Sequence, residues 1–222
     1  MTFHIPHSEL IDLKYEISML EKQLDFIREQ INHQTSASKL VTDQKIEAAN
    51  LDSGDPRDEA DYWYHVDEHN HLVDDVLPRI LINPFAVSIW SLYESAMRDL
   101  ADLIKEKENV ALSFSDIRGK HLPDRVQKYF THVLDFPVRH NSNLRGDLSQ
   151  LKAFRNAIAH QNGRLSGLKK RLKKSIREDE VAGVDIARLG DYFVIRVGFA
   201  EQAFAMIKNH LNGLFNEYED RY

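Results

Sequence analysis

Residues 81–104 read LINPFAVSIWSLYESAMRDLADLI. Apolar side chains recur in this stretch with a period close to 3.6 residues, which predicts an amphipathic helix with one face in a core. The positions that carry the period are Val87, Trp90, Met97, Leu100 and Ile104. Asn83 and Pro84 form a cap-plus-proline signal, so we expect the helix to begin there.

A second helical pattern lies near the N-terminus. Its apolar residues are spaced alternately three and four positions apart: Leu10, Leu13, Ile17, Leu20, Leu24, Ile27 and Ile31. This spacing is the a/d seam of a heptad repeat, and Ser8 is a suitable N-cap before it. Two alternatives are open: a long helix that packs on its own domain, and a coiled-coil arm that pairs two chains. Tyr15, Met19 and Phe26 lie off the seam, and we expect them to widen its apolar face.

Helical patterns also dominate the rest of the chain. We expect a polar loop at 33–39 and helices at 41–50, 56–80, 123–136, 143–160 and 200–220. Residues 184–197 alternate apolar and polar around a Leu-Gly-Asp turn, which predicts a short hairpin. The predicted fold is all-α, with this hairpin before the C-terminal helix. It comprises an N-terminal helical arm, 1–52, and a helical domain, 53–222.

The composition limits the class of protein. The 222 residues are 42% hydrophobic and 29% charged, which is ordinary for a soluble globular chain and excludes collagen-like and disordered classes. Cysteine is absent, which excludes thiol nucleophiles, thiolate zinc sites and disulfides. No apolar run approaches the roughly 18 residues of a membrane span. The first twelve residues lack the basic and apolar regions of a secretion signal, and we expect a cytoplasmic protein.

The net charge of −6 hides an asymmetry between the two halves. Residues 1–111 carry a net charge of −12, whereas residues 112–222 carry +6. Cationic residues without an intervening acid concentrate in one short run: Arg164, Lys169, Lys170, Arg171, Lys173, Lys174 and Arg177. Such a run attracts the phosphates of RNA irrespective of sequence. Two other interpretations are a solvated helix face, and docking to an acidic partner or to the acidic arm of a dimer mate.

The string FRNAIAH, residues 154–160, gathers chemically useful side chains. On a helix Asn156 and His160 share a face, and Arg155 lies about 100° round from Asn156. An imidazole can transfer a proton at neutral pH, and a guanidinium can stabilise the charge on an attacked phosphodiester. RNA supplies its own 2′-hydroxyl nucleophile, so no metal is required. The structural alternative is an ion pair by Arg155 and a helix end at His160.

The spacing Arg155-Asn156-x-x-x-His160 resembles the signature of the HEPN domain family. Residues 81–104 are similar to the core helix of that family with its acidic residue, here Glu94, and residues 114–130 resemble its connecting segment. The resemblance covers roughly residues 75–222. It implies a HEPN-like antiparallel helical bundle that forms a homodimer, with the motifs of two subunits lining one cleft.

The resemblance also implies an activity. Many HEPN proteins are metal-independent endoribonucleases of toxin–antitoxin, abortive-infection or antiviral systems, and others are inactive interaction scaffolds. On the enzymatic interpretation, His160 is the general acid/base, Arg155 stabilises the phosphorane, Asn156 positions one of them, and Glu94 either pairs with Arg155 or is solvated. We expect RNA, a second copy and an antitoxin or defence protein as partners, and no cofactor.

One position departs from the family pattern. Some HEPN toxins carry a tyrosine two residues after the histidine, which a partner enzyme modifies; here that residue is Asn162. We therefore do not expect control by adenylylation there.

A weaker alternative is a metal site on the helix before residue 81. Asp61, His65 and His69 are spaced i, i+4 and i+8, so they share one helix face and offer ligands for a divalent cation. The competing interpretation is an exposed, solvated face.

Overall fold

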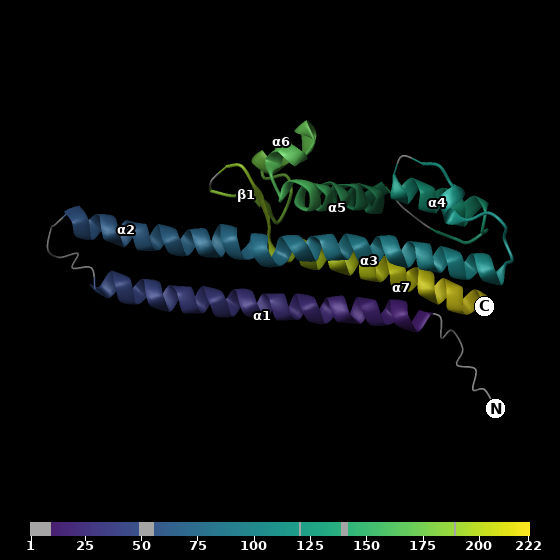
Figure 1. Ribbon diagram of the computed structural model, residues 1–222, viewed down its shortest axis with the longest axis horizontal. Coiled ribbons are helices and arrows are strands. Elements are labelled where there is room, and N and C mark those ends of the chain that lie inside the picture. Colours follow the sequence, from purple (N-terminus) through teal and green to yellow (C-terminus); the bar gives the residue numbers. More distant parts are fainter. Residues whose placement is uncertain (1–9, 49–55, 120, 139–141, 189) are drawn as a thin grey trace, which may run out of the picture. The chain divides into compact units, whose positions relative to one another are not determined.

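The structure is a computed structural model that describes residues 10–48, 56–119, 121–138, 142–188 and 190–222. It is mostly helical with one small antiparallel sheet, as predicted (Figure 1). The helices and strands are α1 (Ile11–Ala48), α2 (Pro56–His71), α3 (Leu77–Lys107), α4 (Leu122–His132), α5 (Ser142–Gln161), α6 (Lys170–Arg177), β1 (Val184–Ile186), β2 (Phe193–Ile195) and α7 (Val197–Arg221). Within the described ranges, no helix combines the length and the apolar character needed to cross a lipid bilayer.

The loop expected at residues 33–39 is not present, because these residues belong to helix α1. The helix runs without a break from Ile11 to Ala48, and residues 41–48 of the short helix expected at 41–50 are its C-terminal part. No glycine or proline interrupts the polar stretch, so nothing in the backbone forces the helix to end. Tertiary contacts also favour the helical form, because Ser38 Oγ lies 2.8 Å from His69 Nδ1 of α2.

The expectation that a helix begins at Asn83-Pro84 was wrong, because both residues lie inside helix α3. A π-helical turn, Leu72–Val76, follows α2, and α3 then begins at Leu77 with Pro84 inside it. Proline has no N–H to donate to the Ile80 carbonyl four residues earlier, which costs one helical hydrogen bond. The flanking side chains of Ile82 and Phe85 are fully buried, and this burial offsets the loss.

The chain divides into two compact units. Unit 1 comprises the described residues up to Glu21, Ala86–Arg155 and Glu201–Tyr222, and unit 2 comprises Lys22–Phe85 and Asn156–Ala200. The division falls within α1, α3, α5 and α7. The predicted domain boundary after residue 52 lies outside the described residues.

In unit 1 the start of α1 is paired with α7. Lys14 Nζ lies 2.5 Å from Glu219 Oε1, and Lys208 Nζ lies 2.6 Å from Glu21 Oε1. The partner number falls as the α1 number rises, so the two helices are antiparallel. Seam residues Leu10, Leu13 and Ile17 are at most 5% exposed. The seam is therefore buried within a single chain, which favours the first of the two alternatives for this helix.

The off-seam residues of α1 do not widen the buried face. Tyr15, Met19 and Phe26 are 62%, 45% and 57% exposed, respectively. Because each residue turns the helix by about 100°, these side chains lie about 150° round from the seam. They form a second apolar row together with Ile11, which is 51% exposed.

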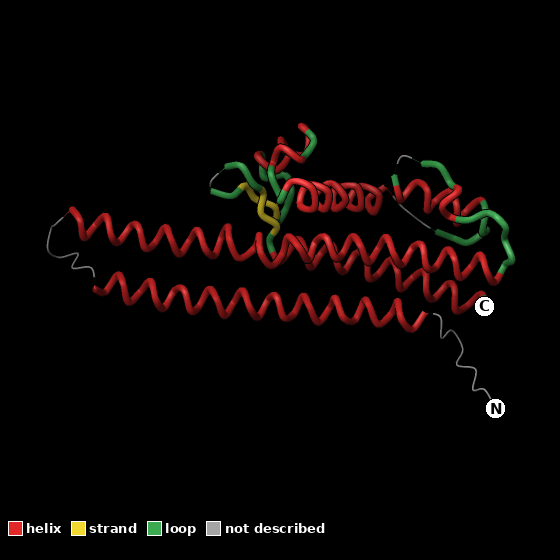
Figure 2. Tube along the Cα trace, viewed as in Figure 1, coloured by secondary structure: helices red, strands yellow, loops and turns green. Residues whose placement is uncertain are grey.

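In unit 2 the hairpin is joined to the segment that follows α5. Strands β1 and β2, yellow in Figure 2, pair antiparallel with Asp185 opposite Val194. Phe193 N donates to Gly163 O at 3.1 Å, and Leu165 N donates to Asp191 O at 2.9 Å. The residues just after α5 therefore lie beside Tyr192.

The end of α5 has a defined backbone geometry. Asn162 and Gly163 adopt left-handed conformations, with φ of 52° and 73°. Gly163 N donates to Ala157 O at 3.0 Å, and Asn162 N donates to Ile158 O at 3.0 Å, so two carbonyls near the end of the helix are capped by the backbone that follows it. This cap turns the chain sharply after Gln161 and directs it toward the hairpin.

Candidate nucleic-acid interface

Helix α5 carries the three motif residues in its last two turns. Leu151, Phe154 and Ala157 are at most 1% exposed and fix the helix through its apolar face. His160 is exposed in the final turn, whereas Arg155 and Asn156 are half-buried. The unit division falls between Arg155 and Asn156, so His160 and Asn156 belong to unit 2 and Arg155 to unit 1.

Glu94 is engaged on its own helix. Its Oε2 accepts a hydrogen bond from Trp90 Nε1 at 3.2 Å, and its Oε1 accepts one from Arg98 Nη2 at 2.7 Å. Both carboxylate oxygens thus have partners on α3. The pairing of Glu94 with Arg155 stays a prediction.

Helix α6 presents most of the basic run to solvent. Ile176 is 1% exposed and anchors the helix, whereas its charged side chains are exposed except for Lys173, which is half-buried. A groove of about 780 Å³ is lined by Lys170, Arg171, Lys173, Lys174, Arg177 and Glu178. Glu178 approaches Lys174 at 3.6 Å, which leaves the groove with a strong excess of positive charge. We call this surface the α6 groove.

A second pocket continues the cationic surface toward the hairpin. It has a volume of about 310 Å³ and is lined by Arg164, Leu165, Ser166, Lys173, Arg177, Gly190 and Asp191. Lys173 and Arg177 belong to both hollows, so the two are contiguous. The predicted RNA-binding residues Arg164, Lys173 and Arg177 are thereby brought together.

Tyr192 connects this surface to α3. The guanidinium carbon of Arg79 lies 3.9 Å from the centroid of the Tyr192 ring, and that of Arg164 lies 5.3 Å from it. The face of an aromatic ring attracts cations, so one tyrosine holds two guanidinium groups. Arg79 and Tyr192 were missed by sequence reasoning, because they are far apart in the chain and belong to no local motif.

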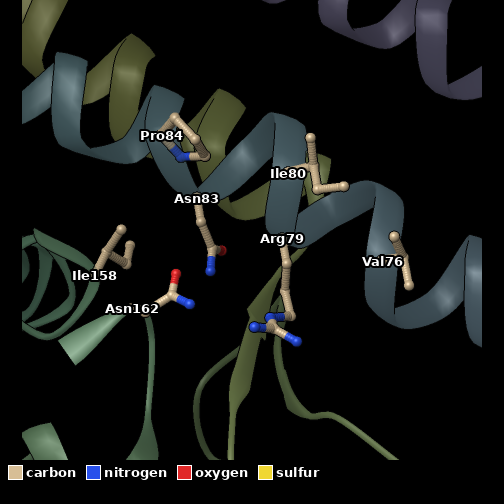
Figure 3. A pocket seen from close by; sticks show the side chains of 7 residues that line it. All are labelled: Val76, Arg79, Ile80, Asn83, Pro84, Ile158 and Asn162. Atoms are coloured by element: carbon tan, nitrogen blue, oxygen red, sulfur yellow. The ribbon is translucent and has the colours of Figure 1, made fainter.

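A third pocket adjoins Arg79. It has a volume of about 330 Å³ and is lined by Val76, Arg79, Ile80, Asn83, Pro84, Ile158 and Asn162 (Figure 3). Its polar side chains are one guanidinium and two amides, and the remainder are apolar. Ile158 and Asn162 lie two residues on either side of His160, so the pocket is next to the end of α5. We call it the α3–α5 pocket.

Unit 2 thus contains two contiguous cationic hollows at α6 and, at the end of α5, the α3–α5 pocket with its guanidinium and two amides. No protein family, curated protein or solved structure matches this chain. The assignment of a function therefore rests on the side chains and geometry of the chain itself.

A buried carboxylate fixes the hairpin that carries Tyr192. Asp75 is 2% exposed, and its Oδ2 lies 3.0 Å from His71 Nδ1 and accepts the Arg188 backbone N–H at 3.1 Å. The Arg188 side chain is paired with Asp67. Arg196 Nε donates to Asp185 at 2.5 Å and its Nη1 donates to the Asp74 carbonyl at 2.6 Å. The bonds to Asp75 and to the Asp74 carbonyl join the hairpin to the π-helical turn.

The candidate metal site is not formed. Among the described residues, no group of three His, Cys, Asp or Glu side chains could hold a metal ion. His69 instead contacts Ser38 of α1, and His65 Nδ1 lies 3.6 Å from Glu68 Oε2. A hydrogen bond from Lys45 lowers the pKa of the Glu68 carboxyl. This polar face therefore helps to join α1 and α2, which run antiparallel in this unit (Figure 1).

Proposed function

We propose that this protein has a HEPN-like helical bundle and is a metal-independent endoribonuclease, acting as a toxin or antiphage-defence effector on single-stranded RNA. The observation that carries the proposal is the exposed imidazole of His160 at the end of α5, in the same unit as the α6 groove. A proton-transfer group open to solvent and a cationic surface for phosphates are the two features that such an enzyme needs.

The proposed chemistry uses only the RNA and the side chains of α5. The 2′-oxygen attacks phosphorus, its proton passes to a basic imidazole, and the bond to the 5′-oxygen breaks as that oxygen receives a proton. The products are a 2′,3′-cyclic phosphate and a 5′-hydroxyl. Arg155 stabilises the charge of the phosphorane, and Asn156 positions the imidazole or a phosphate.

The same chemistry supports a homodimer. One imidazole cannot accept the 2′-hydroxyl proton and protonate the leaving oxygen at the same moment, so two copies of His160 divide the two tasks. Single-stranded RNA is favoured because in-line attack requires a flexible sugar-phosphate backbone. An antitoxin or another defence protein would then control the enzyme by covering the motif.

The test is cleavage of an end-labelled single-stranded RNA by the purified full chain in the presence of EDTA. We expect the wild type to produce 2′,3′-cyclic phosphate ends, and Arg155→Ala or His160→Ala to lower the rate by about 100-fold or more. His33→Ala, which changes an exposed histidine of α1, is the matched control and should cleave normally. Cleavage by His160→Ala at the wild-type rate, or a wild type that never cleaves, would contradict the proposal.

A second candidate function is a catalytically silent interaction scaffold. The observation that favours it is the exposed apolar row of α1, formed by Ile11, Tyr15, Met19 and Phe26. An exposed apolar row of this kind is typical of a surface that binds another protein. If this function holds, the effect that the protein has on cells producing it is abolished by Tyr15→Asp and unchanged by His160→Ala.

A further inference from the structure

The α3–α5 pocket contains a buried amide with unused hydrogen-bonding capacity. Asn83 is 3% exposed, and its Oδ1 accepts the Ile195 N–H at 3.4 Å. Because the Ile195 N–H requires an acceptor, the amide oxygen of Asn83 must face Ile195, and the amide nitrogen, Nδ2, points in the opposite direction. No described residue accepts a hydrogen bond from the Asn83 Nδ2 group, and Figure 3 shows the amide directed toward Asn162. The Nδ2 group is therefore available to a ligand that supplies an acceptor.

The backbone beside this amide leaves it room. A Cβ atom at Gly163 would lie 3.1 Å from Asn83 Nδ2, and Gly163 has a φ of 73°. Any side chain at this position would press on the amide. The glycine therefore keeps the donor group of Asn83 accessible from the pocket.

Arg79 supplies a positive charge at the same place. Its guanidinium is held over the Tyr192 ring, which leaves the N–H edges available. In the part of the chain that the structure describes, no carboxylate pairs with Arg79. Arg79 and Asn83 are four residues apart on α3, and Figure 3 shows both side chains extending from the same side of that helix. A charged group and a donor thus lie side by side.

The remaining walls suit a planar or ring-shaped group. Val76, Ile80 and Ile158 provide apolar surface, and the pocket volume of about 330 Å³ is at the lower end of the range for small-molecule sites. Asn162 is exposed at the rim and offers both a donor and an acceptor. An anion alone would not use the apolar walls, whereas a nucleotide would use every part of the pocket.

We propose that the α3–α5 pocket binds one nucleotide of the RNA substrate, farther along the strand than the phosphodiester that is cleaved with the help of His160. Arg79 binds a phosphate of this nucleotide, Asn83 Nδ2 donates to an acceptor on the base, and the base ring packs on Ile80 and Ile158. The identity of the ligand as RNA rests on the proposed function. The pocket then adds base preference to an enzyme whose α6 groove binds phosphates without regard to sequence.

The test measures binding of short fluorescent single-stranded RNAs to the full chain carrying His160→Ala, which prevents cleavage. We expect Arg79→Met and Asn83→Asp each to weaken binding by about tenfold, since each removes a contact to a charged or buried group. Asn83→Asp keeps the oxygen that accepts from Ile195 and replaces the Nδ2 donor in the pocket with an acceptor. It should therefore also change the order in which RNAs carrying each of the four bases are preferred. Asn162→Asp is the exposed variant that tests the same rim if Asn83→Asp does not fold. Arg28→Met, on the exposed side of α1, is the matched control and should bind as the parent does.

Competition experiments identify the ligand. Nucleoside monophosphates should displace the RNA, whereas inorganic phosphate and unphosphorylated nucleosides should not. Displacement by inorganic phosphate at the same concentration would reduce the pocket to an anion site and overturn the proposal. RNA binding and base ranking unchanged in both Arg79→Met and Asn162→Asp would also overturn it.

The failure of this proposal differs from the failure of the proposed function. A wild type that cleaves RNA, combined with pocket variants that bind normally, removes the pocket and leaves the nuclease. A wild type that never cleaves, but binds nucleoside monophosphates through Arg79 and Asn83, leaves a nucleotide pocket and removes the nuclease.

Discussion

His71 Nδ1 lies 3.0 Å from Oδ2 of Asp75, a carboxylate that is almost completely buried in the π-helical turn before α3. The same oxygen accepts the backbone N–H of Arg188. A single carboxylate therefore joins the end of α2 to the hairpin that carries Tyr192. The π-helical turn positions this carboxylate, as irregular helical turns often do near functional sites.

We expect Asp75→Ala to destabilise the fold and to loosen the hairpin. The substitution leaves the Arg188 N–H without its acceptor, which costs about 1–3 kcal/mol. For a chain of this size, each kcal/mol lowers the melting temperature by about 2–4 °C. Thermal unfolding followed by circular dichroism measures the change. Asp61→Ala, at an exposed position of α2, should melt with the wild type, and an equal melting temperature for both variants would show that the Asp75 bonds contribute nothing.

We expect acidic pH to lower the stability of the fold because of His210. Burial lowers the pKa of His210 in α7 to about 4, whereas an unfolded histidine has a pKa near 6.5. Above about pH 6.5 both states are neutral and the stability is complete. Below about pH 6.5, His210 binds a proton in the unfolded chain but stays neutral in the folded chain. The free energy of unfolding therefore decreases by up to roughly 3 kcal/mol as the pH falls to about 4.

Urea unfolding at a series of pH values measures this loss. His210→Phe keeps an aromatic ring beside Tyr93, whose ring centroid lies 6.1 Å from that of His210, and removes the proton-binding group. The difference between the wild type and this variant isolates the His210 contribution from the other titrating groups. A difference that does not change between about pH 7 and pH 4 would contradict the assignment.

Gly163→Ala should cost stability, whereas Gly146→Ala should not. Gly163 has a φ of 73°, which disfavours a side chain by about 1–2 kcal/mol, and the new methyl group would also lie 3.1 Å from Asn83 Nδ2. Gly146 lies inside α5 with nothing within 4 Å of its missing Cβ, so alanine there should stabilise the helix by roughly 0.5–1 kcal/mol. Chemical denaturation of both variants checks the opposite signs.

The α6 groove should set the salt dependence of RNA binding. Each phosphate contact to single-stranded nucleic acid contributes about 0.7 to the slope of log K against log salt concentration. Lys170→Ala and Arg171→Ala should each reduce the slope by about that amount and weaken all sequences equally. Lys22→Ala, on the exposed face of α1, serves as the control. An unchanged slope in both groove variants would exclude the groove from the RNA path.

Local patterns were sufficient for several elements. The period of residues 87–104, the seam of α1 and the alternation of the hairpin each depend on neighbours in sequence, and each predicted element is present. The loop expected at 33–39 and the helix start expected at Pro84 were wrong, because contacts with α2 and the burial of Ile82 and Phe85 outweigh the local preferences.

The candidate site was predicted only where it is contiguous in sequence. The motif of α5 and the basic run of α6 could be found from spacing and charge. The α3–α5 pocket could not, because Arg79 and Asn83 of α3 meet Ile158 and Asn162 only in the folded chain. The pair Asn83-Pro84 was interpreted as a helix cap, which its position inside α3 rules out.

The cap that ends α5 has a chemical consequence for storage of the protein. In an Asn-Gly pair the glycine nitrogen can attack the asparagine amide, release ammonia and form a succinimide that opens to aspartate or isoaspartate. Donation of the Gly163 N–H to the Ala157 carbonyl holds that nitrogen away from the reaction. Ageing at alkaline pH should therefore convert Asn162 only as fast as the helix end frays, and peptide mapping of an old preparation would reveal molecules that already carry a carboxylate at the rim of the pocket.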